Sequence, residues 1–299
     1  MDRTRWQAKG PLPEDMAMLV WFITGSSRGF GLEIARLALE RGDAVVATAR
    51  DPRQVETALP GFGDRLLTPA LDVTNEEQAR EAVAQAMQRY TRIDVLVNNA
   101  GRGLMGAAEE ASDEEVRDLF ETNVFGLLTV TRAVLPIMRK QRSGRVLNIS
   151  SVGGFTNFRA GADIYGATKF AVEGISEAMR AELEPLGIWV TIVEPGAFRT
   201  DFLDPRSLRM SRRTIADYAA TAGQTRDWAQ REHRQQPGDP ARAAAAMIKI
   251  ATVAHPPLRL PLGPDSVARI EEKLTSVARE LDRWRDLAQS TSYDHAALA

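Results

Sequence analysis

The sequence predicts an α/β fold in which helices cover both faces of a doubly wound parallel sheet. From Met18 onward, short β-branched runs alternate with longer segments of helical period, which is the pattern of repeated strand–helix–strand units. Most of the short runs are apolar almost throughout, as expected for strands that are covered on both faces. A length of 299 residues with 44% hydrophobic residues is enough for one large domain with a substantial core.

Seven short runs are strand candidates. In chain order they are residues 19–24, 44–48, 66–71, 93–98, 145–150, 188–193 and 258–262. Pro69 lies inside the third candidate, and proline has no backbone N–H to donate to a neighbouring strand. We therefore expect the third strand at an edge of the sheet.

Several helix starts carry their own signals. Ser112 with Glu115, and Thr74 with Glu77, fit the capping box, in which the hydroxyl accepts from a free N–H and the glutamate reaches back. Asp239 stands before a proline, which is a favoured first residue of a helix. We expect helices to begin at these three places.

The domain organisation is simple. The chain shows no internal repeat and no low-complexity linker, so we expect one domain over residues 16–299. Residues 1–15 lack the apolar core of a secretory signal and are interpreted as a flexible extension or a wrongly extended start. With no targeting signal in the sequence, a cytoplasmic location is the default expectation. Residues 201–238 form a charged insertion with the aromatic residues Phe202, Tyr218 and Trp228.

The last long helix is expected over residues 266–288. Its apolar residues alternate at spacings of three and four: Val267, Ile270, Leu274, Val277, Leu281 and Trp284. A coiled-coil seam is one interpretation of this spacing, and packing against the sheet or a sister subunit is the other, which we favour.

Composition excludes several classes of function. Lysine and arginine (38) nearly balance aspartate and glutamate (40), so the formal net charge of -2 gives no basic excess for nucleic acid or anionic membranes. No apolar run reaches the roughly 18 residues of a membrane helix. With no cysteine and only 3 histidines, disulfides, thiol nucleophiles and most metal sites are excluded or disfavoured, and no metal is expected.

A glycine-rich turn follows the first strand candidate. It reads Thr24-Gly25-Ser26-Ser27-Arg28-Gly29-Phe30-Gly31 and leads into a helix. Glycines there let the backbone approach a pyrophosphate, and the free N–H groups of the helix start favour its negative charge. A second glycine cluster, Gly101, Gly103 and Gly106, is rejected as the phosphate site because the next helix is capped only at Ser112.

Tyr165 and Lys169 are the second chemical signal. Four residues apart on a helix, they share one face, so the phenol and the ammonium can serve one site. A free tyrosine has a pKa of about 10. A fixed cation beside it favours the phenolate and so lowers that pKa. Ser150 and Ser151 end the fifth strand candidate at the carboxyl edge, where open α/β sheets bind ligands.

These motifs occur in one order along the chain: the glycine turn, Asp72 before Val73, Asn98 to Gly101, Asn123, Ser151, Tyr165 with Lys169, and Pro195-Gly196 with Thr200. Together they resemble the short-chain dehydrogenase/reductase family from about Leu19 to Thr200. The resemblance implies a Rossmann fold with seven strands in the order 3-2-1-4-5-6-7. It also implies an oxidoreductase that moves a hydride between a nicotinamide cofactor and a carbonyl or alcohol substrate.

The resemblance assigns roles to individual residues. Tyr165 is the general acid/base, Lys169 lowers its pKa and holds the ribose, Ser151 binds the substrate oxygen, and Asn123 carries a water link to Lys169. Ser150 is the alternative to Ser151. The implied cofactor-binding residues are Gly25, Ser27, Arg28, Gly29, Phe30, Gly31, Arg50, Asp72, Val73, Asn99, Ala100, Gly101, Tyr165, Lys169, Pro195, Gly196 and Thr200. The substrate is selected largely by the segment after Thr200, which makes residues 201–238 a substrate-binding segment or lid.

Charge predicts a preference for NADP(H) over NAD(H). The second strand candidate is followed by Ala49-Arg50, so the carboxylate that would accept the adenosine ribose hydroxyls of NAD is missing. Arg50 and Arg28 can both attract a 2′-phosphate. Two solvated arginines are the alternative interpretation, and Asp51 can still compete for the ribose.

Two hypotheses of function follow. The first is an NADP(H)-dependent carbonyl reductase or alcohol dehydrogenase that acts on a small molecule. The second is a non-catalytic NADP(H)-binding sensor or interaction protein on the same fold. Family members commonly form homodimers or homotetramers through the helices here expected near residues 112–140 and 163–184. Apolar residues on the first of these helices allow such pairing: Phe120, Leu127, Val130 and Val134.

Overall fold

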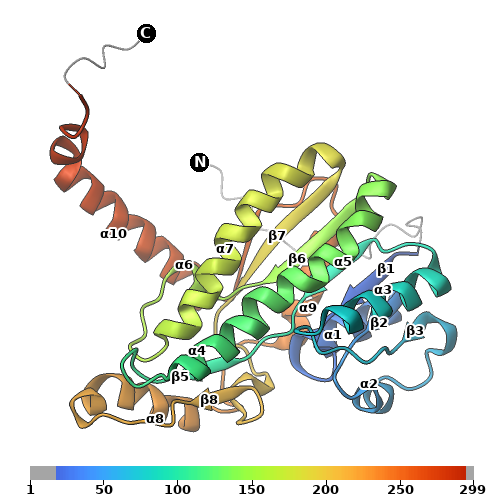
Figure 1. Cartoon of the computed structure of the whole chain (residues 1–299), viewed down its shortest axis with the longest axis horizontal. Helices are drawn as coiled ribbons and strands as arrows, with labels where there is room; N and C mark the ends of the chain where they lie inside the picture. Colours follow the sequence, from blue (N-terminus) through green and yellow to red (C-terminus); the bar gives the residue numbers. More distant parts are fainter. Residues whose placement is uncertain (1–17, 294–299) are drawn as a thin grey trace.

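The computed structural model describes residues 18–293. Its main sheet is parallel and has the spatial order β3-β2-β1-β4-β6-β7-β9, so the predicted order of the seven strand candidates is confirmed (Figure 1). The strands are β1 Val20–Ile23, β2 Ala44–Ala47, β3 Leu66–Leu67, β4 Val95–Asn98, β6 Gly144–Ile149, β7 Ile188–Pro195 and β9 Arg259–Leu262.

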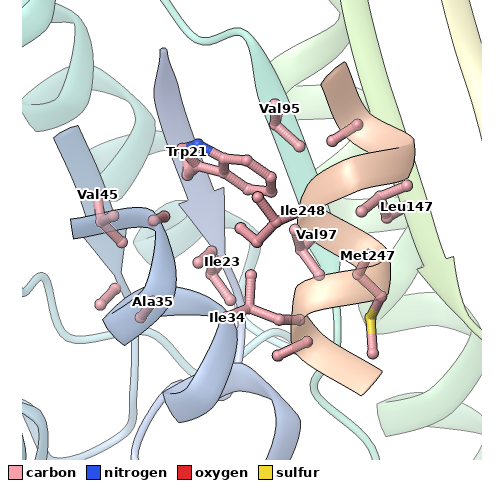
Figure 2. Close-up of a cluster of buried hydrophobic side chains, with 14 of the residues drawn as sticks. Trp21, Ile23, Ile34, Ala35, Val45, Val95, Val97, Leu147, Met247 and Ile248 are labelled. Carbon is pink, nitrogen blue, oxygen red and sulfur yellow. The ribbon is translucent and has the colours of Figure 1, made fainter. Parts of the chain in front are cut away.

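Helices cover both faces of this sheet. One face carries α1 (Gly29–Glu40), α2 (Pro52–Ala58) and α9 (Pro240–Thr252). The other carries α3 (Glu76–Tyr90), α5 (Gly126–Gln141) and α7 (Asp163–Leu183). The side chains of β1 alternate between the two layers. Trp21 and Ile23 pack toward α1 and α9 (Figure 2), whereas Phe22 belongs to the cluster on the opposite side.

Strand β3 lies at the edge, as Pro69 predicts, but it is shorter than expected. Regular pairing ends at Leu67, and a single bridge between Ala49 and Ala70 continues it. The missing N–H of Pro69 explains the interruption, because no ladder hydrogen bond can be donated there.

The helix starts are confirmed at two of the three predicted places. Ser112 and Glu115 form the reciprocal capping box of α4 (Asp113–Phe120), and Asp239 caps α9. The third prediction is wrong by one residue: Asn75 caps α3, while the Thr74 hydroxyl donates to Asp72 at 2.8 Å. Thr74 is therefore part of a local turn rather than the cap.

The predicted helix over residues 112–140 is interrupted by a π-helical turn. This turn, η2 (Glu121–Phe125), joins α4 to α5. Leu127, Val130 and Val134 face the core of their own chain, which corrects the expectation that they supply an oligomer surface. The exposed aromatic side chains on these helices are instead Phe125 and, on α7, Phe170.

A second, two-stranded sheet was not predicted. It pairs β5 (Gly103–Met105) with β8 (Leu208–Met210) and joins the rejected glycine cluster to the segment after Thr200. That segment also contains η4 (Asp201–Leu203), η5 (Ala216–Tyr218), η6 (Ala219–Gly223) and α8 (Gln224–Arg231). The short elements η1 (Gly63–Arg65), α6 (Val152–Phe155) and η3 (Glu184–Leu186) complete the body.

The last helix, α10 (Pro264–Gln289), projects away from the body of the molecule (Figure 1). Its base is attached through Ser266, which is fully buried and donates to the backbone oxygen of Glu194 at 2.7 Å. Within residues 18–293, no helix has the length and apolar character needed to cross a membrane.

Candidate active site

A cleft of about 1030 Å³ opens at the carboxyl ends of the central strands. It is lined by the turns that follow β1, β2, β4, β6 and β7, and by part of α7. In a parallel α/β sheet this edge is where ligands bind. The cleft therefore brings together segments that are far apart in the sequence.

The glycine turn forms one wall of the cleft. Gly25 has a φ of +68°, and a Cβ on it would lie 3.0 Å from the Cα of Ala100. A Cβ on Gly31 would lie 2.5 Å from the backbone oxygen of Gly25. Helix α1 starts at this turn with no side-chain cap and no acidic residue in its first turn, so its N–H groups are available to an anion. The turn fits a pyrophosphate.

The turns after β1 and β4 are tied to one another. The Asn99 amide Nδ2 donates to the backbone oxygens of Thr24 and Gly25 at 2.9 and 3.0 Å. The Thr24 hydroxyl accepts from the N–H groups of Asn99 and Ala100 at 2.9 and 3.0 Å. Through these hydrogen bonds Asn99 fixes the backbone of the glycine turn.

The cleft has a basic corner beside the end of β2. Arg50 is exposed and lines it, as does Arg28, whose Nη2 donates to the Ser207 hydroxyl at 2.9 Å. Asp51 caps α2, and its two carboxylate oxygens accept from the Arg53 guanidinium at 2.9 and 3.1 Å. This ion pair lowers the pKa of Asp51. The competing carboxylate is therefore already held by Arg53.

Tyr165 lines another wall of the cleft and lies in the first turn of α7. Its ring packs on Phe202 with a centroid distance of 5.3 Å. Burial raises the pKa of Tyr165 to about 12, and a hydrogen bond with Ser151 opposes this rise. The phenol is therefore protonated at neutral pH.

Lys169 lies one turn further along α7. Its Nζ donates to the backbone oxygen of Ile149 at 2.8 Å and lies 5.9 Å from the Tyr165 ring centroid. Burial lowers the pKa of Lys169 to about 8, against the opposing effect of Glu173. The predicted lowering of the Tyr165 pKa by Lys169 is not observed, because the desolvation of the phenol dominates.

Asn123 supports this wall from the π-helical turn. Its Nδ2 donates to the Arg102 backbone oxygen at 2.9 Å and to the Thr168 hydroxyl at 3.1 Å, and its Oδ1 accepts from the Arg102 N–H. A Cβ on Gly101 would lie 3.3 Å from Asn123 Oδ1 and 3.7 Å from Lys169 Nζ. The side chains of Asn123 and Lys169 therefore both lie close to Gly101.

The two serines after β6 have different surroundings. Ser151 is partly exposed to the cleft, caps α6 by accepting from the Gly153 N–H at 3.0 Å, and is hydrogen-bonded to Tyr165. The Ser150 hydroxyl is buried without a hydrogen-bond partner, and a Cβ on Gly154 would lie 2.4 Å from it. The geometry thus places Ser151, rather than Ser150, beside the phenol.

Nearly all of the predicted site residues line the cleft. The two that do not are Gly31, which packs under the turn, and Asn123, which lies behind Gly101. Sequence reasoning missed Asp265 at the base of α10. Its Oδ2 accepts from the Ala197 N–H at 2.8 Å, and a Cβ on Gly196 would collide with its carboxylate. The signal was the proline before Asp265, which marks a helix start.

Known proteins share this architecture. The family model described as short chain dehydrogenase matches residues 19–210. The 3-ketodihydrosphingosine reductase of Bacteroides thetaiotaomicron is 40% identical over 243 residues, which are 81% of this chain and 87% of that protein. A short-chain dehydrogenase structure from Streptomyces avermitilis is 44% identical, with a TM-score of 0.86 over 93% of this chain and 100% of the other.

A further solved structure is the closed form of serine dehydrogenase complexed with NADP+. It is 30% identical, with a TM-score of 0.70, and the match covers 83% of this chain and 96% of the other. These relatives carry the names of dehydrogenases and reductases, which does not favour the non-catalytic sensor. The chain therefore belongs to the short-chain dehydrogenase/reductase family and is an NAD(P)-dependent oxidoreductase.

Proposed function

We propose that this chain transfers a hydride between NADP(H) and a carbonyl or alcohol substrate, with Tyr165 as the general acid/base. The observation that carries the proposal is that Tyr165, Ser151 and Lys169 line the same cleft as the glycine turn. A bound nicotinamide would supply or accept the hydride, and the protein then has to orient the substrate and move one proton.

The residues of the chain divide this work. During carbonyl reduction, the Tyr165 phenol donates its proton to the substrate oxygen, and during alcohol oxidation the phenolate removes it. The Ser151 hydroxyl binds the same oxygen and positions it beside the phenol. The Lys169 ammonium holds the ribose of the cofactor, and Asn123 connects Lys169 to water. A protonated tyrosine at neutral pH suits the reductive direction.

The preference for NADP(H) rests on the basic corner. Arg28 and Arg50 supply donors for a 2′-phosphate, and the pairing of Asp51 with Arg53 removes a carboxylate that would repel it. The similarity to a serine dehydrogenase solved with NADP+ supports the same cofactor. We place the adenine beside Asp72 and Val73, and the nicotinamide beside Pro195, Gly196 and Thr200, all of which line the cleft.

We propose that residues 201–238 shape an apolar substrate site. Phe202, Leu203 and Trp228 line the cleft, and Phe202 contacts the ring of Tyr165. Tyr218 is instead an anchor of the segment, since its hydroxyl donates to Glu109 at 2.8 Å. This arrangement favours ketones or aldehydes with an apolar group next to the carbonyl.

Replacement of the phenol tests the reaction. Tyr165→Phe is expected to lower kcat for NADPH oxidation, over a panel of aldehydes and ketones, by about 10²–10⁴-fold because the proton donor is lost. NADPH binding, followed by titration calorimetry, should persist. Tyr218→Phe is the matched control and should keep kcat. An unchanged kcat in Tyr165→Phe would reject the assignment.

Removal of the basic corner tests the cofactor. Arg50→Ala should raise KM for NADPH by about tenfold, the loss of one charge-assisted hydrogen bond, while KM for NADH changes little. Arg80→Ala removes an arginine that is paired with Glu76 on α3 and should change neither constant. Equal effects of Arg50→Ala on both cofactors would refute the proposed preference.

A further inference from the structure

Helix α10 carries an apolar stripe that, beyond the base of the helix, no other part of residues 18–293 covers. From residue 271 to residue 290 every residue is exposed. Leu274, Leu281 and Trp284 are 55%, 54% and 54% exposed, although side chains of this size are usually buried. In proteins most of the stability of a helix comes from packing of its apolar face, so a partner is expected to stabilise α10.

The stripe has the geometry of a coiled-coil seam rather than of a helix that packs on a sheet. Its spacing alternates three and four over three heptads, with Val267, Leu274 and Leu281 at the a positions and Ile270, Val277 and Trp284 at the d positions. A helix that packs on a globular core usually adds apolar residues at e or g. The flanking positions here are mostly charged, and include Glu271, Lys273, Glu280 and Arg285.

The charges of α10 argue against a membrane surface as the partner. The helix has six acidic and five basic side chains, so it lacks the basic polar face that binds anionic lipids. The same mixture of signs suits a protein partner with a similar mixture.

We propose that α10 pairs with the α10 of a second copy of this chain as an antiparallel two-stranded coiled coil. In an antiparallel pair each a residue lies opposite a d residue. Three kinds of layer follow, in which Leu274 meets Val277 of the second copy, Leu281 meets Ile270, and Trp284 meets Val267. Each layer sets a larger side chain against a β-branched one, which fills space better than two large or two small residues together.

The flanking charges are compatible with the antiparallel orientation, and the seam residues favour it over the parallel one. At the g positions, Lys273 of one copy lies beside Glu280 of the other, and the twofold symmetry repeats this attractive pair. A parallel pair would set Leu274 against Leu274 and Trp284 against Trp284, with β-branched residues at d, whereas parallel dimers favour them at a.

A measurement of mass tests the pairing on the full-length chain. Leu274→Glu combined with Leu281→Glu should halve the particle mass by light scattering, because charges enter the seam. The matched control, Thr275→Glu with Ser276→Glu, adds the same charges on the outer face and should keep the wild-type mass. In both variants the circular dichroism spectrum should show that the body of the protein remains folded. An unchanged mass in the seam variant would overturn the proposal. The stripe would then be covered by residues 1–17 of its own chain or by nothing.

Charge reversal tests the orientation. Lys273→Glu should raise the dissociation constant of the pair about tenfold, and the addition of Glu280→Lys should restore it, since the antiparallel pair is then re-formed with opposite signs. In a parallel pair the added lysine would instead face Arg285 and weaken binding further. Failure of the double reversal to rescue pairing overturns the antiparallel arrangement.

Discussion

At the residue scale, the two serines after β6 show how local geometry separates similar side chains. Ser151 opens to the cleft and is hydrogen-bonded to Tyr165, whereas the Ser150 hydroxyl is enclosed beside Gly154. A hydroxyl that positions a substrate oxygen must reach both the oxygen and the phenol. In the structure Ser151 lies beside the phenol and lines the cleft, whereas the Ser150 hydroxyl is buried.

This difference predicts unequal effects of the same substitution. Ser151→Ala should lower kcat by about 10²-fold or more, because the substrate oxygen loses its fixed donor, with NADPH affinity unchanged. Ser150→Ala, the neighbouring control, should keep kcat within a few-fold. Steady-state kinetics with one ketone and saturating NADPH measure both. A larger loss in Ser150→Ala would exchange the proposed roles of the two serines.

The sequence could predict most of the residues that line the cleft, but not their electrostatics. Tyr165 and Lys169 were placed on one helical face by spacing alone, and both line the cleft. The predicted lowering of the Tyr165 pKa was wrong because burial is a tertiary property: it raises the Tyr165 pKa and lowers that of Lys169. Asp265 was missed because its contact, the Ala197 N–H, is distant in sequence.

At the element scale, one arginine ties the last strand to its neighbours. Arg259 on β9 forms ion pairs with Glu173 and Glu177 of α7, and with Glu194 of β7 at 2.8 Å. Glu194 is fully buried, and its burial together with the nearby charge of Glu173 raises its pKa to about 7. One arginine therefore does not compensate for two buried carboxylates.

The raised pKa of Glu194 gives stability a definite pH dependence. The folded state keeps the proton of Glu194 up to about pH 7, whereas the unfolded chain loses it near the ordinary pKa of 4.5. The contribution of Glu194 to the free energy of unfolding therefore falls as the pH rises from 4.5 to about 7. Glu194→Gln should remove that loss, and so stabilise the protein at pH 8 relative to wild type but change little at pH 4.5. Denaturant unfolding at both values measures this.

Glu177 provides the control for this experiment. It pairs with the same arginine but its side chain is 54% exposed, so Glu177→Gln should give no comparable gain at pH 8. If Glu194→Gln instead destabilises the protein more at pH 8 than at pH 4.5, then Glu194 is ionised at neutral pH and its pairing with Arg259 outweighs its burial.

At the scale of the whole molecule, the sheet could be predicted because its strands are buried. Runs such as those of β1 and β2 carry apolar residues on both faces, which only a covered parallel sheet requires. The β5–β8 sheet could not be predicted, since each strand has three residues and their pairing joins Gly103 to Leu208. The exposure of α10 could not be predicted either, because the spacing of its apolar residues fits both a covered and a projecting helix.

The assembled cleft predicts that the cofactor stabilises the whole chain. At a concentration of about 100 times its dissociation constant, NADPH should add about 2.7 kcal/mol to the free energy of unfolding, or roughly 5 °C in Tm, because only the folded chain has the cleft. Gly31→Ala should abolish this shift, since its Cβ would lie 2.5 Å from the Gly25 oxygen and deform the turn. Gly174→Ala, with nothing within 4 Å of its Cβ, should keep the shift. Thermal unfolding with and without NADPH distinguishes the two, and an equal shift in both variants would mean that the cofactor does not bind at the glycine turn.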